Sequence, residues 1–105
     1  MIDLPPEDLA EVQRILKEHV PQYKVVAFGS RVNRKAKIWS DLDLCIIGNK
    51  PLSLKDTAML EDAFSISNLP IKVDIVDWAG TENNFRCIIQ KNSIVIQDPE
   101  KTRAH

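Results

Sequence analysis

The feature that most constrains the fold is the run DLDLCIIG, which begins at Asp41 and joins two acidic residues to an apolar stretch. Side chains alternate across a β-strand, so every second residue lies on the same face. One face of this run carries Leu42, Leu44 and Ile46, which predicts that this face packs on a hydrophobic core. Asp41 and Asp43 then project together from the other face, at the start of the strand.

Helical and strand patterns alternate along the 105 residues. Apolar residues at helical spacing predict helices, and β-branched or aromatic runs predict strands. The expected helices cover 5–20, a stretch from 53 that the SNLP segment ends, and a stretch that opens at 81; the expected strands cover 23–28, 41–48, 71–78 and 93–97. This order indicates one α/β (or α+β) domain, residues 1–105, with a flexible polar tail at about 98–105.

The second expected helix has an apolar set that comprises Leu54, Ala58, Leu60, Ala63 and Phe64, and the third contains Phe85, Ile88 and Ile89. The cysteines Cys45 and Cys87 form no CxxC pair; Cys45 falls inside an apolar run and Cys87 in an expected helix. We therefore expect two reduced, mostly buried thiols.

The charge balance disfavours nucleic acid as a direct substrate. Lys and Arg total 14 against 15 Asp and Glu, a net charge of -1, which is not the broad basic footprint of a nucleic-acid-binding protein. A local basic cluster, which could hold a phosphate, comprises Arg31, Arg34, Lys35 and Lys37. The acidic N-terminal segment and the lack of a long apolar stretch predict no signal peptide, no membrane contact and a cytoplasmic protein.

A third aspartate, Asp74, lies in the strand pattern IKVDIVDW, between two apolar neighbours that point to the core. If this strand neighbours the strand expected at 41–48, Asp74 joins Asp41 and Asp43 on one face. Carboxylates this close repel one another unless a cation neutralises them. Oxygen ligands without His or Cys favour Mg²⁺, or Mn²⁺, over zinc. Asp77, at the strand exit, is interpreted as a surface or capping residue.

Two metal ions bridged by such aspartates can support an in-line displacement at phosphorus. A DxD pair alone more often marks a solvated strand end. The third aspartate and a glycine-serine turn upstream favour the metal site. In that turn, Gly29 directly follows a strand and allows a ligand close to the backbone, while Ser30 and Arg31 can donate to phosphate. As an ordinary helix N-cap, Ser30 needs no ligand.

Taken together, these motifs resemble the nucleotidyltransferase signature of the DNA polymerase beta superfamily. The resemblance rests on Gly29-Ser30 at a strand end, SDLDL after a short basic segment and VDIVD on a later strand, and it spans Val25 to Trp78. The short chain and the form FGSR…SDLDL resemble the minimal nucleotidyltransferases, or MNT proteins. One departure is Asn33, near the place where many relatives carry a second glycine.

The resemblance implies a small mixed sheet flanked by helices, and a reaction. A nucleoside monophosphate would pass from a nucleoside triphosphate, with ATP favoured, to an acceptor, and pyrophosphate would leave. Gly29 and Ser30, with Arg31 adding charge, would hold the β- and γ-phosphates. Asp41, Asp43 and Asp74 would hold Mg²⁺, and Asp74 would also help to remove the proton of the attacking hydroxyl.

A chain this short is expected to need a partner to enclose the acceptor. The resemblance implies a HEPN-domain toxin, with this chain as its antitoxin in a hetero-oligomer, and Trp39, Trp78 and Phe85 are candidates for an apolar contact surface. Two alternatives stay open: a non-catalytic nucleotide-binding antitoxin that acts by contact, and a two-metal phosphodiesterase. The glycine-serine turn favours a triphosphate over the second of these. His19 and His105 are assigned to no site.

Overall fold

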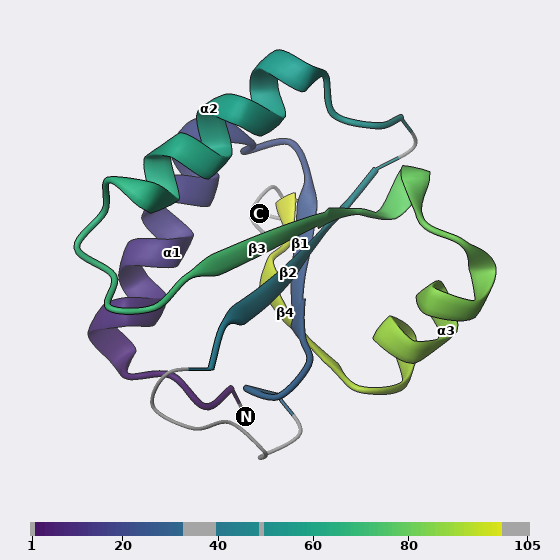
Figure 1. Ribbon diagram of the computed structural model, residues 1–105, viewed down its shortest axis with the longest axis horizontal. Coiled ribbons are helices and arrows are strands. Elements are labelled where there is room, and N and C mark those ends of the chain that lie inside the picture. Colours follow the sequence, from purple (N-terminus) through teal and green to yellow (C-terminus); the bar gives the residue numbers. More distant parts are fainter. Residues whose placement is uncertain (1, 33–39, 49, 100–105) are drawn as a thin grey trace.

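The computed structural model describes residues 2–32, 40–48 and 50–99. Its elements follow the alternation expected from the sequence (Figure 1), and they are α1 (Pro6–His19), β1 (Lys24–Phe28), β2 (Leu42–Ile47), α2 (Leu54–Ser65), β3 (Val73–Asp77), the short 3₁₀ helix η1 (Trp78–Gly80), α3 (Asn83–Lys91) and β4 (Ser93–Gln97). Several residues discussed above lie outside the described residues: Asn33, Arg34, Lys35, Lys37, Trp39, His105 and the tail from 100 onward.

The four strands form one mixed sheet in the order β3-β2-β1-β4. Strand β1 runs antiparallel to both of its neighbours, β2 and β4. Strands β2 and β3 run parallel, with α2 in the connection between them. The expected fold class, a small mixed sheet with flanking helices, is therefore confirmed. Within the described residues, no helix is both long and apolar enough to cross a membrane.

The main core lies between one face of the sheet and helices α1 and α2, which pack side by side against it (Figure 1). From the sheet it receives Leu42, Leu44 and Ile46, all fully buried as the strand alternation predicts. The helices contribute Leu16 from α1 and Leu60 from α2, also fully buried. This layer fixes which side of β2 faces the helices and therefore where its aspartates project.

The opposite face of the sheet carries a smaller apolar cluster beneath α3, which lies apart from α1 and α2 (Figure 1). Its buried members are Val26, Phe28, Cys45 and Ile89. Cys45 therefore shares the aspartate face of β2, as the alternation predicts. Burial raises the pKa of its thiol to about 11, with a smaller contribution from Asp77, so the thiol stays protonated at neutral pH.

Helix geometry shows which of the apolar residues of α2 are buried, and it corrects the expected burial of Cys87. Leu54 is 91% exposed and Ala58 is exposed, whereas Leu60 on the same helix is buried. Successive residues turn about 100° round a helix, so Leu54 lies about 120° from the buried stripe and Ala58 almost opposite to it. Cys87 is likewise exposed, because its position on α3 lies opposite to that of buried Ile89.

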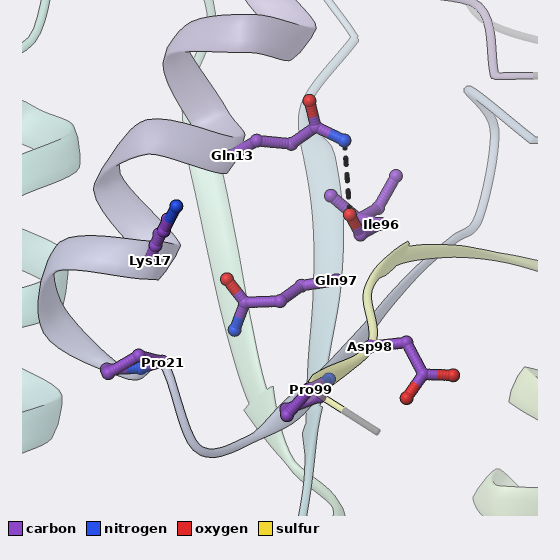
Figure 2. A pocket seen from close by; sticks show the side chains of 7 residues that line it. All are labelled: Gln13, Lys17, Pro21, Ile96, Gln97, Asp98 and Pro99. Carbon is purple, nitrogen blue, oxygen red and sulfur yellow. Dashed lines mark hydrogen bonds between the residues drawn. The ribbon is translucent and has the colours of Figure 1, made fainter. Parts of the chain in front are cut away.

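Strand β4 is held at its edge of the sheet by α1. The register with β1 shifts so that Val25 pairs with Gln97 and Val26 with Val95, which leaves Ile96 as an extra, bulged residue. The Gln13 side-chain amide donates to the Ile96 carbonyl at 3.1 Å (Figure 2). A hollow of about 320 Å³ opens beside this bond, where α1 meets the strand. Strand β1 separates it from the strands that carry the aspartates.

Candidate active site

Parallel pairing of β2 with β3 brings Asp43 and Asp74 into register, one directly beside the other. Both project from the face that also carries Cys45, opposite to the main core. The expected neighbourhood of these two strands is therefore confirmed. Asp41 lies one residue before β2 and is exposed, so it stands at the open edge of this acidic pair.

The acidic pair is electrostatically strained. The pKa of Asp43 is raised, first by partial burial and then by the negative charges of Asp74 and Asp41. Lys72 lies 3.6 Å from Asp74, but both side chains of this ion pair are exposed, so solvent screens it. A divalent cation beside Asp43 would favour its charged form and would therefore lower its pKa.

Gly29 makes the close approach of the turn to Asp43 possible. Its φ is +82°, a left-handed conformation that L side chains rarely adopt. A Cβ at this position would collide with Oδ2 of Asp43 and lie 3.3 Å from its Cγ. The turn at Gly29 and the carboxylate of Asp43 are thus in contact, although they come from separate parts of the sequence.

The guanidinium of Arg31 binds backbone carbonyls of the chain itself. Arg31 is only 6% exposed, and its guanidinium donates to the Ser40 carbonyl at 3.1 and 2.9 Å and to the Asp3 carbonyl at 2.8 Å. These bonds tie the turn to the start of β2 and to the N-terminal segment. Arg31 therefore positions the turn, and its expected contact with phosphate stays a prediction. The expected contact of Ser30 with phosphate also stays a prediction. Ser30 is half-buried in a turn that a 3.0 Å hydrogen bond from Val32 N to the Gly29 carbonyl closes.

Asp77 has the capping role that its position predicts. Its carboxylate accepts from Ala79 N at 3.3 Å at the start of η1, and from Leu52 N at 2.8 Å before α2. Because it lies three residues after Asp74 on β3, it points to the opposite face of the sheet. It fastens two connections and takes no part in the acidic pair.

A pocket of about 520 Å³ opens over the acidic pair. Its walls come from the sheet and from α3, and they comprise Phe28, Gly29, Asp43, Asp74, Val76, Phe85, Ile88 and Asn92. Sequence reasoning placed the acidic end of this pocket and missed its apolar wall. The available signal was the spacing of Phe85, Ile88 and Asn92, which places them on one side of a helix.

The acidic pair suits magnesium chemistry. Among residues 2–32, 40–48 and 50–99, no three His, Cys, Asp or Glu side chains gather closely enough to hold a metal by themselves. Mg²⁺, however, is commonly bound by one or two carboxylates and completed by waters and substrate phosphates. Asp43 and Asp74 fit that pattern, while the full triad with Asp41 stays a prediction.

Comparison with known proteins identifies the family of the chain. Residues 10–102 match the family model described as polymerase beta, nucleotidyltransferase, so the chain belongs to that family. The family resemblance noted in the sequence is thereby confirmed, and the chain is a nucleotidyltransferase. It is 52% identical over 101 residues to a probable protein adenylyltransferase MntA of Haemophilus influenzae, covering 96% of this chain and 89% of the relative.

Two solved structures share the fold at low sequence identity. A crystal structure of a toxin-antitoxin with AMP-PNP matches with a TM-score of 0.73 and 17% identity, over 89% of this chain and 76% of that chain. A tri-AMPylated Shewanella oneidensis HEPN toxin in complex with MNT antitoxin matches with a TM-score of 0.67 and 16% identity, over 91% and 74%. At these identities the likeness establishes the fold alone.

Replacing Gly29 by alanine tests the contact between the turn and Asp43. We expect Gly29→Ala to lower the free energy of unfolding by about 1–2 kcal/mol, because the new Cβ meets both a left-handed backbone and a carboxylate. Urea denaturation measures the change. Gly80→Ala is the matched control, because a Cβ there meets nothing within 4 Å. Equal stability of the two variants would contradict the proposed contact.

Replacing Asp43 by asparagine tests the electrostatic strain. A carboxyl whose folded pKa is raised costs stability once it is ionised, and this cost declines as pH falls below the folded pKa and is gone below the unfolded pKa. Without metal at neutral pH, we expect Asp43→Asn to be more stable than the parent by at most about 1 kcal/mol, because solvent screens the open site. The difference should disappear in acid.

Thermal melts in a chelator, with Asp62→Asn on the exposed surface of α2 as control, measure this effect. An Asp43→Asn variant that melts well below the parent would instead show that Asp43 is needed to hold the fold together.

Proposed function

We propose that this chain transfers AMP from ATP to a hydroxyl group of a HEPN-domain protein partner. The observation that carries the proposal is the register of Asp43 with Asp74 beside the Gly29 turn, in a chain of the nucleotidyltransferase family. Support for protein adenylylation comes from the 52% identity to a probable protein adenylyltransferase. Support for the partner comes from a fold neighbour crystallised with an AMPylated HEPN toxin.

In the proposed reaction, the acceptor oxygen attacks the α-phosphorus of ATP and the bond to pyrophosphate breaks. The Gly29-Ser30 turn holds the β- and γ-phosphates through backbone amides and the serine hydroxyl. Asp41, Asp43 and Asp74 hold Mg²⁺, or Mn²⁺, which supplies positive charge to the phosphate oxygens when bound. Asp74 accepts the proton that the acceptor hydroxyl loses. Arg31 acts on the phosphates through the turn that it anchors.

The partner completes the site. The described residues that line the pocket come from the sheet and from α3, and in this proposal the acceptor reaches the acidic pair from another chain. We propose a hetero-oligomer in which this chain is the antitoxin and the HEPN protein is both acceptor and toxin. We also propose that the reaction takes place in the cytoplasm, where ATP is available.

A transfer assay with α-labelled ATP and a co-purified HEPN-domain partner tests the proposal. We expect label on the partner that requires Mg²⁺ and disappears with a chelator. Asp74→Asn should slow transfer roughly 10²- to 10⁴-fold, the range for loss of a general base, without loss of the complex. Asp62→Asn should leave the rate unchanged.

Other outcomes separate the alternatives. Neutralisation of the partner without any label on it would mean that the chain acts by contact and refute the proposed transfer. Hydrolysis of an added phosphodiester substrate, with no dependence on the partner, would instead support the two-metal phosphodiesterase.

A further inference from the structure

Helix α3 leaves apolar side chains exposed inside the pocket. Phe85 is 38% exposed and Ile88 is 60% exposed. Both side chains line the pocket that also contains Asp43 and Asp74. Val76, from β3, continues this surface down to the sheet. One end of the pocket is therefore acidic and bordered by a glycine turn, while the other end is apolar.

Several contacts hold this apolar wall in place. The Phe85 ring meets Phe28 edge-on, with ring centroids 5.8 Å apart and planes at 82°. The Arg86 guanidinium donates to the Trp78 carbonyl at 3.1 and 2.7 Å and lies 4.9 Å from the centroid of the Trp78 ring. Ile89 is fully packed in the cluster beneath α3. The exposed parts of Phe85 and Ile88 thus belong to a fixed surface.

We propose that Phe85 and Ile88 form the platform on which the nucleobase of the bound nucleotide packs. This inference rests on the proposed function, which places the triphosphate at the acidic end. A nucleotide has a charged end and a flat apolar end, and the pocket has walls of both kinds. Its volume of about 520 Å³ lies within the range of about 300–1,000 Å³ that is typical of small-molecule sites.

The nucleobase fits this wall better than an acceptor side chain does. The wall is built by the same chain, in the same pocket, as the groups assigned to the phosphates. The acceptor belongs to another protein and enters opposite the leaving pyrophosphate, as in-line displacement requires. Any base can stack on an aromatic face, so the platform secures the nucleotide without reading its identity.

Calorimetric titration of the full chain with ATP and with tripolyphosphate, each with Mg²⁺, tests the platform. Phe85→Leu keeps an apolar side chain against Phe28 but removes the aromatic face. We expect its affinity for ATP to fall about 5- to 150-fold, the range for loss of one base–aromatic stack, with tripolyphosphate affinity unchanged. Lys17→Ala, beside the distant hollow at β4, should bind both ligands as the parent does.

A second variant, Ile88→Ala, tests the platform in case Phe85→Leu disturbs the fold. Ile88 is mostly exposed, so Ile88→Ala should keep the parental melting temperature and weaken ATP binding roughly 10-fold, without effect on tripolyphosphate. Unchanged ATP affinity in both variants, or an equal loss for both ligands, would overturn the platform.

The same measurements distinguish a failure of the proposed function from a failure of the platform alone. If the parent chain binds neither ligand and labels no partner, the triphosphate site itself is wrong and the platform falls with it. If the parent transfers AMP but Phe85→Leu and Ile88→Ala bind ATP normally, only the platform is wrong.

Discussion

The parallel pairing of β2 with β3 is the constraint on which the rest of the site depends. It places Asp43 beside Asp74 on a partly buried face, where burial first, and then the charges of Asp74 and Asp41, raise the pKa of Asp43. The pairing is fixed from the other side of the sheet, because Leu42, Leu44 and Ile46 are committed to the core under α1 and α2. A slip of one residue would turn these apolar side chains outward and the carboxylates inward. Core packing thus keeps two like charges together.

The residues around Asp43 and Asp74 keep the site accessible to a ligand at a cost in folding stability. Gly29 accepts a left-handed backbone so that the turn can lie against Asp43. Helix α3 covers the buried Cys45 and Phe28 but leaves Phe85 and Ile88 partly exposed to the pocket. Charge repulsion and exposed apolar surface both cost free energy in the isolated chain. In the proposed function, a bound metal-nucleotide would relieve both costs.

Strand alternation and helix spacing predicted most of the fold, because periods of two and 3.6 residues determine which side chains can share a face. The same alternation placed Asp43 and Asp74 on one side of the sheet. It could not place Arg31, whose guanidinium goes to the carbonyls of Asp3 and Ser40, since only the folded chain brings that N-terminal segment near the turn. Nor could it separate Phe85 from core residues, because an apolar pocket wall and a core have the same spacing.

The most direct test of the account is a thermal melt of the chain with Mg²⁺, with ATP, with both and with neither, on the parent and on Asp43→Asn. We expect the parent to be stabilised only when both are present, by about 2.7 kcal/mol when the ligand is at about one hundred times its dissociation constant. The variant should show no such gain. Equal stabilisation of parent and variant, or a parent that does not respond to the two together, would contradict a metal-nucleotide site at the paired aspartates.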